Sequence, residues 1–345
     1  MSVRKEQYFG STDSSYEAAV KHHSGTKSLF SINRLEEVLK AILLDVPKVF
    51  KLLLLVAWVG LRHSVKLFLP AQRKSIKGQI ALVTGGANGL GKALCLRLAR
   101  EGCSVAVADV DFSSAQATAE EVRECTGGSV KVQAFHVDVG DFNSVAQLKQ
   151  NIEKTLGPVD ILVNNAGLLA ILSLSEGTPE DVQKIVNVNL MSHFWTIREF
   201  KAGMVERRRG HIVAISSVLG MIPFGRTICY NTTKTAINGL MASLNEEFYL
   251  NGLSDELHTT TVYPVGIRTR KQFVDLMHEL RLRMPWHSPE YVADRIVDGV
   301  LENKTDVVPS YFYVRIFIKY FAILPTTFIR LYSDIFVGKV PQLTE

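Results

Sequence analysis

The sequence predicts an α/β protein built on a doubly wound parallel sheet of about seven strands. Short apolar runs alternate with segments of helical spacing, a glycine-rich turn follows the first run, and acidic or small polar residues follow later runs. Apolar strands that alternate with helices form right-handed β-α-β units, whose parallel sheet is covered on both faces. With 345 residues, the chain is long enough for one large domain of this kind plus appendages.

The predicted elements run from residue 77 to residue 309, and we expect them to form a single domain. Helices are expected between the first four strands, where apolar residues recur every three or four positions, at 89–102, 114–125 and 141–157. Strands are expected at 79–84, 104–109, 130–138, 160–165, 211–217, 258–264 and 306–309.

A glycine-rich turn, residues 84–91 (TGGANGLG), lies between the first strand and the first helix. Glycine allows a tight turn, lets the main chain approach a pyrophosphate and permits close packing of helix on strand. The N–H groups and partial positive charge of a helix N-terminus favour phosphate binding. The turn therefore predicts a dinucleotide site on a Rossmann-type fold. The contacts expected here come from Gly85, Asn88, Gly89, Leu90 and Gly91.

Acidic and small polar residues end the next three strands. Asp109 ends the second strand, eighteen residues after Gly91. A carboxylate at this point accepts hydrogen bonds from ribose hydroxyls and repels a 2′-phosphate, so we expect NAD(H) rather than NADP(H). Asp138, with Val139 beside it, is expected near the adenine. The fourth strand ends in Asn165, Ala166 and Gly167, small residues that let the main chain approach a ligand.

Charge and cysteine usage exclude several other classes of protein. The net charge of +5 is modest, and the cations crowd around one apolar stretch at residues 52–61, which is more typical of an anionic membrane surface than of nucleic-acid binding. We expect no nucleic-acid partner. The cysteines show no paired spacing, so neither a disulfide framework nor a metal site is expected; they are Cys95, Cys103, Cys125 and Cys229.

The N-terminal region predicts a membrane anchor. Residues 1–34 are polar and predicted to be disordered, and residues 35–70 are predicted to form a helical anchor. Its uncharged core is about half of the ~20 residues that a spanning helix needs. The flanking Lys48, Lys51 and Arg62 fit an in-plane helix or re-entrant hairpin with its cations among the headgroups. A tilted spanning helix and a helix packed on the catalytic domain remain open.

Two later segments have the same mixture of apolar and basic residues. Residues 310–345 are predicted to be a hydrophobic C-terminal segment, either membrane-associated or a packed helix pair. Residues 268–283 predict a basic amphipathic lid, which either lies on the membrane or packs only on its own pocket.

Taken together, the motifs resemble the short-chain dehydrogenase/reductase family over residues 78 to about 308. "HFWT" (193–196) and the segments before the first strand are similar to its membrane-anchored branch, which contains epidermal retinol dehydrogenases and lipid-droplet 17β-hydroxysteroid dehydrogenases. The resemblance implies an N-terminal anchor and activity on hydrophobic alcohols or ketones. It rests on the turn 84–91, Asp138, the NNAG run 164–167, Asn189, Ser217, and Tyr230 with Lys234.

The resemblance implies that Tyr230, Lys234, Ser217 and Asn189 are catalytic. Tyr230 and Lys234 lie four residues apart and would share a helix face. A free phenol, with a pKa of about 10, is a poor base at neutral pH. The ammonium group and a positive nicotinamide are expected to lower that pKa. Ser217 would hydrogen bond to the substrate oxygen, with Ser216 pointing away from it, and Asn189 would hold a water behind Lys234.

Further cofactor contacts are implied by the same resemblance. Tyr230 and Lys234 would also face the bound cofactor, with Lys234 on the nicotinamide ribose. Pro264 and Thr269 follow the sixth strand, and Thr269 would touch the nicotinamide carboxamide. The family often has Pro-Gly at this point, whereas this chain has Pro264-Val265, so the path of the main chain is left open.

We therefore expect a membrane-anchored oxidoreductase that transfers hydride between NAD(H) and a hydrophobic alcohol, ketone or aldehyde such as a retinoid, steroid or other lipid. It would reside on the endoplasmic reticulum membrane, the lipid droplet or both, with the catalytic domain facing the cytosol; a homodimer is left open. A scaffold protein with an incidental dehydrogenase fold and an NADP-dependent carbonyl reductase are the alternatives. The apolar pocket is expected to be lined by Leu168, Leu169, Leu219, Met221, Ile222 and Phe224.

Overall fold

The computed structural model describes residues 40, 43, 45–58, 60, 72–169, 177–222, 227–269, 285–321 and 327. The chain divides into two compact units, Met1–Ala71 and Gln72–Glu345, which are treated separately below. We call the second one the catalytic unit.

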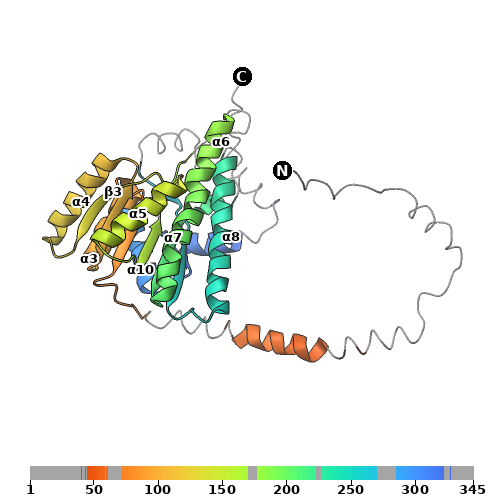
Figure 1. Cartoon of the computed structure of the whole chain (residues 1–345). Coiled ribbons are helices and arrows are strands. Elements are labelled where there is room, and N and C mark those ends of the chain that lie inside the picture. The colour runs from red at the N-terminus through yellow and green to blue at the C-terminus, as the bar shows by residue number, and fades with distance from the viewer. Residues whose placement is uncertain are drawn as a thin grey trace, which may run out of the picture. The chain divides into compact units, whose positions relative to one another are not determined.

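The catalytic unit is built around a seven-stranded sheet in which every pair of neighbouring strands is parallel (Figure 1). The strand order is β3-β2-β1-β4-β5-β6-β9, so the expected seven-stranded parallel sheet is confirmed. The strands are β1 (Ile80–Thr84), β2 (Ser104–Asp109), β3 (Val132–His136), β4 (Ile161–Asn164), β5 (Gly210–Ile215), β6 (Leu257–Val262) and β9 (Asp306–Val307).

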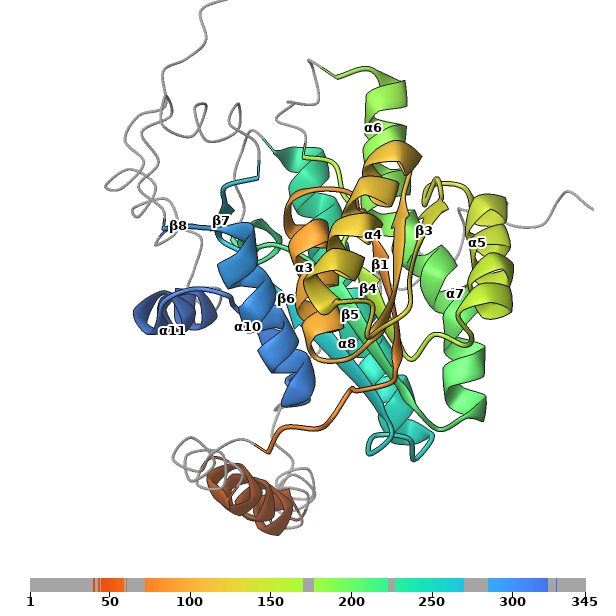
Figure 2. The same cartoon turned by 90° about the vertical axis from the view of Figure 1, so that its left-hand side faces the viewer.

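Helices cover both faces of this sheet (Figures 1 and 2). One face packs against α3 (Gly89–Arg100), α4 (Phe112–Thr126) and α10 (Pro289–Leu301). The other packs against α5 (Phe142–Thr155), α7 (Ser192–Glu206) and α8 (Ile228–Leu250). Between β4 and α7 the chain forms α6 (Pro179–Val186) and a single π-helical turn, Asn187–Met191. A 3₁₀ turn, Val218–Gly220, follows β5, and α11 (Phe312–Phe321) follows β9.

Alternation along β1 shows how the sequence builds these two layers. Ala81 and Val83 contribute to the hydrophobic core under α3, α4 and α10, whereas Leu82 contributes to the core on the opposite face. Successive side chains of a strand point to opposite faces, and a strand buried on both faces must be apolar throughout. The uninterrupted run IALV is therefore the correct pattern for a central strand.

Polar side chains fix where several helices begin. Asp111 accepts a hydrogen bond from the main-chain N–H of Ser114 at the start of α4, and Ser288 accepts one from Tyr291 at the start of α10. At α6, Thr178 and Asp181 form a capping box. Such caps satisfy main-chain donors that have no partner inside the helix.

A second, two-stranded sheet was not predicted from the sequence. β7 (Gly266–Ile267) pairs in parallel with β8 (Trp286–His287). Each strand has only two residues, so its sequence cannot show the alternation of apolar and polar residues that predicts a strand. The two strands flank residues 270–284, so most of the predicted lid lies outside the described residues.

In the first unit, residues 45–58 form a helix within the segment predicted to be an anchor, and the anchoring itself stays a prediction. Large apolar side chains along this helix are exposed, including Phe50, Leu53 and Trp58 at 60–62%. Within the described part of the chain, no helix combines the length and apolar character needed to cross a membrane. The predicted disorder of residues 1–34 falls outside the described residues.

The segment that opens the catalytic unit is attached at the amino-terminal end of the sheet. Ile76 is buried, and the Nζ of Lys74 lies 2.9 Å from Nδ1 of His211, the second residue of β5. The main-chain N–H of Lys74 donates to the carbonyl of Leu301 at the end of α10. Residues 72–76 are therefore bound to both β5 and α10.

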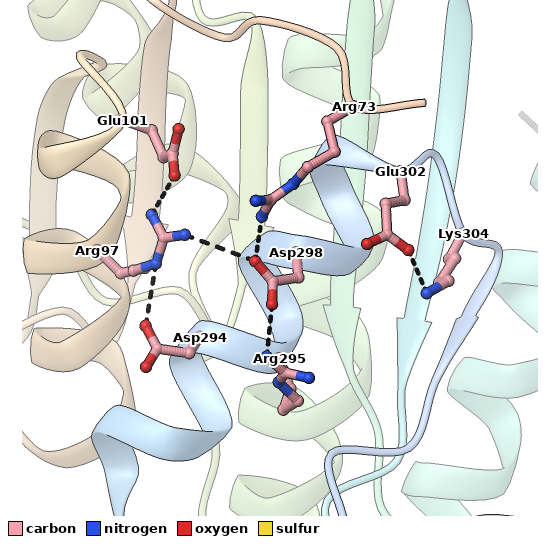
Figure 3. Close-up of polar contacts among 8 residues, drawn as sticks. All are labelled: Arg73, Arg97, Glu101, Asp294, Arg295, Asp298, Glu302 and Lys304. Atoms are coloured by element: carbon pink, nitrogen blue, oxygen red, sulfur yellow. Dashed lines mark hydrogen bonds and ion pairs between the residues drawn. The ribbon is translucent and has the colours of Figure 1, made fainter. Parts of the chain in front are cut away.

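Ion pairs join the same segment to α3 and α10 (Figure 3). Asp298 on α10 is the shared acceptor, because it contacts Arg73, Arg97 and Arg295. Arg97 on α3 also pairs with Asp294 at 3.0 Å and with Glu101 at 2.5 Å. Lys304 and Glu302 form a separate pair nearby.

Candidate active site

The predicted site residues gather at the carboxyl ends of the parallel strands. β1 runs into the glycine-rich turn, β2 ends at Asp109, and β5 ends two residues before Ser217. Helix α8 carries Tyr230 and Lys234 in its first two turns. The order of the strands reverses between β1 and β4, and open α/β sheets bind ligands outside the strand ends at such a switch point.

The glycine-rich turn is shaped by close approaches that only glycine permits. Gly85 has a φ of +64°, and a Cβ at this position would lie 2.8 Å from Cα of Ala166. A Cβ at Gly91 would lie 1.9 Å from the carbonyl oxygen of Gly85, far inside van der Waals contact. Asn88 precedes α3 without a side-chain cap. The N-terminus of α3, including the buried Leu90, therefore borders the turn as a phosphate cradle requires.

Asp109 is held next to this turn by main-chain donors. Its Oδ2 accepts a hydrogen bond from the N–H of Ala87 at 3.0 Å, and its Oδ1 accepts one from Asp111 at 3.1 Å. Each carboxylate oxygen has a second lone pair, so the group can still accept bonds from a ligand. Val110 beside it is 65% exposed and carries no charge.

A network of hydrogen bonds ties the end of β4 to the turn. The side-chain amide of Asn165 donates to the carbonyls of Thr84 and Gly85, at 2.9 and 3.0 Å. The hydroxyl of Thr84 in turn accepts from the main-chain N–H groups of Asn165 and Ala166. These bonds fix the NNAG run and the glycine-rich turn as one rigid surface, with Gly167 exposed at its edge.

The remaining predicted cofactor residues border the same region. Asp138 is exposed after β3, where its Oδ1 accepts from the N–H of Gly140, and Val139 is buried. Thr269 reaches the turn, because a Cβ at Gly89 would lie 3.1 Å from its Cγ2. The carbonyl of the buried Pro264 accepts from the N–H of Val218, which ties the chain after β6 to the loop of Ser217.

Lys234 and Tyr230 lie on the same side of α8, as the four-residue spacing predicts. The Nζ of Lys234 lies 5.6 Å from the centroid of the Tyr230 ring, and it donates to the carbonyl of Ile215 at 2.7 Å. Lys234 is buried, and this burial lowers the pKa of its ammonium to about 8.

Burial acts against the expected lowering of the Tyr230 pKa. Burial raises the pKa of this phenol, and a hydrogen bond from the Ser217 side chain only partly opposes that rise. The physical reason for the rise is that desolvation penalises the phenolate, while the ammonium is held by the main chain of β5. The lowering expected from Lys234 together with a positive nicotinamide stays a prediction.

Ser216 and Ser217 point in different directions, as strand alternation predicts. The Ser217 hydroxyl bonds to Tyr230 and accepts from the N–H of Leu219 at 3.1 Å. The Ser216 hydroxyl instead lies 2.9 Å from the carbonyl of Lys234 and 2.7 Å from Oδ1 of Asn238. Ser217 is thus the serine that faces the phenol.

Asn189 is fully buried in the π-helical turn before α7. Its Oδ1 accepts from the N–H of Leu168 at 2.7 Å, and its Nδ2 donates to the carbonyl of the same residue at 2.8 Å. A Cβ placed at Gly167 would lie 3.6 Å from Asn189 Oδ1 and 3.7 Å from Lys234 Nζ. Asn189 and Lys234 therefore both face Gly167, while the water that Asn189 was expected to hold remains a prediction.

Two buried polar residues, Asn164 and His193, belong to motifs named from the sequence but were not assigned a role in the site. His193, one turn after Asn189, is 1% exposed, and burial together with the charge of Lys234 lowers its pKa to about 3. Within the described part of the chain, His193 Nε2 and Asn164 Nδ2 have no hydrogen-bond partner. A histidine in an apolar helix, within "HFWT", was the signal available for this position.

The predicted apolar pocket residues fall in two places. Leu168 and Leu169 follow β4, and Leu169 is 43% exposed. Leu219, Met221 and Ile222 pack against a small core that includes residues of α11. Phe224 lies outside the described residues. Among the residues that the structure describes, no cluster of side chains could bind a metal ion.

A family model described as "short chain dehydrogenase" matches residues 79–273, more than half of the chain. The chain belongs to this family. Short-chain dehydrogenase/reductase family 16C member 6 from Bos taurus is 31% identical, covering 73% of this chain and 78% of that protein. 17-beta-hydroxysteroid dehydrogenase 13 from Rattus norvegicus is 31% identical, covering 79% and 90%. Epidermal retinol dehydrogenase 2 from Homo sapiens is 30% identical, covering 75% and 82%.

Solved members of the short-chain dehydrogenase family share the fold. A Burkholderia phymatum enzyme in complex with NAD superimposes with a TM-score of 0.63 at 21% identity, covering 79% of this chain and 99% of that one. A metagenomic oxidoreductase in complex with NADP gives a TM-score of 0.56 at 25% identity, covering 69% and 100%. The predicted resemblance to the retinol and steroid dehydrogenase branch is confirmed by these relatives, and the chain is an oxidoreductase of the short-chain dehydrogenase family.

Proposed function

We propose that this oxidoreductase transfers hydride between NAD(H) and a hydrophobic alcohol or its carbonyl product, with Tyr230 as the acid and base. The observation that carries the proposal is the grouping of Tyr230, Ser217 and Lys234 at the same strand ends as the glycine-rich turn and Asp109. The turn fits a dinucleotide because its main chain could not accept a side chain at Gly85 or Gly91.

Proton transfer is assigned to Tyr230. When bound, the nicotinamide would accept the hydride in oxidation and supply it in reduction. Tyr230 would take the hydroxyl proton of an alcohol and return it to a carbonyl oxygen in the reverse direction. Ser217, which already bonds to the phenol, would donate to the same substrate oxygen as negative charge develops on it.

Lys234 and Asn189 support that proton transfer. Ile215 fixes the Lys234 ammonium near the phenol, where its charge favours the phenolate. Because the pKa of Lys234 is about 8, the group can also gain or lose a proton close to neutral pH. Asn189, which is held by Leu168, would position a water between Lys234 and solvent.

The preference for NAD(H) rests on Asp109. Its carboxylate is fixed beside the turn by Ala87 and Asp111, where a 2′-phosphate would meet a negative charge. The residue that follows Asp109 at the end of β2 is the apolar Val110, which offers no positive charge to bind a 2′-phosphate.

Membrane attachment and a lipid substrate complete the proposal. The helix at residues 45–58 exposes a continuous set of large apolar side chains, with Lys48 and Lys51 exposed among them. Apolar side chains with lysines at the water boundary suit an interfacial helix. Two relatives are named for retinol or hydroxysteroid substrates, which are alcohols of this polarity. We assign the protein to the endoplasmic reticulum membrane or the lipid droplet, with its catalytic unit in the cytosol.

The decisive experiment compares the full-length protein with its Tyr230→Phe variant in the presence of NAD and a panel of retinols and hydroxysteroids. We expect turnover by the parent and a loss of about 10²–10⁴-fold in the variant. Tyr249→Phe, on the exposed side of α8, is the matched control and should keep full activity. Equal turnover by parent and Tyr230→Phe would exclude the proposed base.

A further inference from the structure

Helix α11 has two faces of different character. Val314 and Ile318, four residues apart, are buried at 9% and 4% exposure. Phe312, Tyr313 and Ile316 are 73%, 68% and 43% exposed. Residues three and four apart share a helix face, so these three form a second apolar stripe that points away from the first. We call Phe312, Tyr313 and Ile316 the outer stripe.

The inner face of α11 packs on the loop that carries Ser217. Val314 and Ile318 form a small core with Val218, which directly follows Ser217, and with Tyr263 after β6. Leu219, Met221, Ile222 and Val265 pack against the same core. The position of the Ser217 loop therefore depends on α11.

The start of α11 is fixed to the small sheet of β7 and β8. The ring of His287 on β8 stacks on Tyr291 of α10 at 4.7 Å and meets Tyr311 edge-on at 5.1 Å. His287 Nε2 also lies 3.0 Å from the hydroxyl of Ser310. Figure 2 shows α11 and α10 as neighbours at one side of the catalytic unit. The helix thus has a defined orientation on the catalytic unit, and so does its outer stripe.

The charge around the outer stripe favours an anionic lipid surface over a protein partner. Arg315 is exposed on the described part of α11, and residues 307–318 contain no Asp or Glu to balance its charge. In the sequence, Lys319 and Arg330 follow before the next acidic residue, Asp334. Aromatic and aliphatic side chains beside unbalanced cations are typical of helices that lie in the headgroup region of anionic membranes.

We propose that the outer stripe of α11 is a membrane-contact surface for anionic phospholipid, and that α11 links lipid contact to the Ser217 loop. The evidence for the membrane-contact surface is the exposure of the outer stripe and the charge beside it. The link between this surface and catalysis rests on the proposed function. A lipid alcohol dissolved in the same membrane would then meet the catalytic unit beside the loop that binds its oxygen.

The test of the surface uses the full-length protein and the fluorescence of one added tryptophan. Phe312→Trp places the probe in the outer stripe, and Leu250→Trp places it at the end of α8, where the parent side chain is equally exposed at 74%. The unmodified protein gives the background from its own tryptophans. Vesicles contain brominated phosphatidylcholine with or without phosphatidylserine.

We expect the tryptophan at residue 312 to lose most of its fluorescence when brominated vesicles that contain phosphatidylserine are added. Vesicles without phosphatidylserine should quench it much less. The emission added at residue 250 should be unchanged in both cases. Three results would contradict the proposed membrane-contact surface. These are equal quenching at residues 312 and 250, no quenching at residue 312, and quenching at residue 312 that is the same with and without phosphatidylserine.

The link to catalysis is tested with Phe312→Ser/Tyr313→Ser/Ile316→Ser. Turnover of a retinol dissolved in anionic vesicles should fall several-fold, while NADH affinity and turnover of a short water-soluble alcohol stay unchanged. Val314→Ala, on the inner face, should instead lower kcat for both substrates without changing NADH affinity. Unaltered retinol turnover in the triple variant would overturn the link. If the parent protein turns over no alcohol, the proposed function is wrong. The quenching experiment still shows whether the outer stripe contacts the membrane.

Discussion

The ammonium of Lys234 is bound to the carbonyl oxygen of Ile215 at 2.7 Å, on the last residue of β5. The lysine is therefore positioned by the sheet. Tyr230, whose ring centroid lies 5.6 Å from this Nζ, has a pKa raised by burial in the same state. A cationic nicotinamide, when bound, would add positive charge that favours the phenolate.

The first prediction concerns the titration of Tyr230. Burial disfavours the charged phenolate, so its pKa should exceed the ordinary value of about 10 in the free protein and fall when NAD⁺ binds. Phenolate absorbance of the parent minus that of Tyr230→Phe measures this directly, with Tyr249→Phe as the control for an exposed tyrosine. A phenolate that forms below pH 10 without NAD⁺ would contradict the prediction.

Lys74 should give the stability of the protein a pH dependence of known sign. Burial lowers its pKa to about 8, below the ordinary value of about 10.5. Between these values the unfolded chain binds more protons than the folded one, so this residue makes the free energy of unfolding rise with pH. Lys74→Met should remove that rise in urea titrations at pH 7.5 and pH 10. The exposed Lys77→Met variant should keep it.

Two glycine-to-alanine variants should have opposite effects. A Cβ at Gly91 would collide with the carbonyl of Gly85, so Gly91→Ala should abolish measurable NADH binding and destabilise the protein by about 1–3 kcal/mol. Gly239 lies within α8 with no atom within 4 Å of its added Cβ, so Gly239→Ala should stabilise by roughly 0.5–1 kcal/mol. Isothermal titration calorimetry measures NADH binding, and denaturant unfolding measures the stability of each variant. Tight NADH binding by Gly91→Ala would contradict the role of the glycine-rich turn.

Asp298 should carry most of the stability of the ion-pair group in Figure 3. Asp298→Asn leaves Arg73, Arg97 and Arg295 without their shared carboxylate and should lower the free energy of unfolding by about 1–2 kcal/mol. Glu302→Gln breaks a single pair with Lys304 and should cost less than about 0.5 kcal/mol. Proteolysis near residues 72–76 should also quicken only in Asp298→Asn, and equal effects of the two variants would argue against a shared acceptor.

Asp109→Ser should change cofactor preference. Loss of the carboxylate removes an acceptor for the ribose and the repulsion of a 2′-phosphate, so kcat/KM with NAD should fall about 10–100-fold and NADP should become usable. Asp111→Asn keeps a residue suited to cap α4 while removing a neighbouring charge, so it should retain the preference for NAD. Tighter binding of NADPH than NADH by the parent would show that Asp109 does not select the cofactor.

The strands, the glycine-rich turn and the order of the site residues could be predicted because each depends on local spacing. IALV is apolar throughout because β1 is buried on both faces, and the reversal of strand order brings the end of β4 next to the turn. Ser217 and Ser216 were assigned correctly to opposite sides because alternation in a strand is regular.

Other features depend on contacts between distant segments, which spacing does not reveal. The bond from Lys234 to Ile215 and the raised pKa of Tyr230 follow from burial in three dimensions. The pairing of β7 with β8 joins two-residue strands whose first residues, Gly266 and Trp286, are twenty positions apart in the sequence. The burial of His193 is likewise set by the packing of α7 on β4.

Residues 72–76 enter the catalytic unit at the amino-terminal end of β5, whereas Ser217 follows its carboxyl end. A six-residue strand spans about 20 Å, so this point of entry and the reacting groups stand at opposite ends of the sheet. Mechanical tension on the preceding chain would be borne by the bonds of Arg73 and Lys74 to α10 and β5. A tag or protease site placed just before Gln72 would consequently be remote from the reacting groups, which makes that position the natural one for immobilising the enzyme.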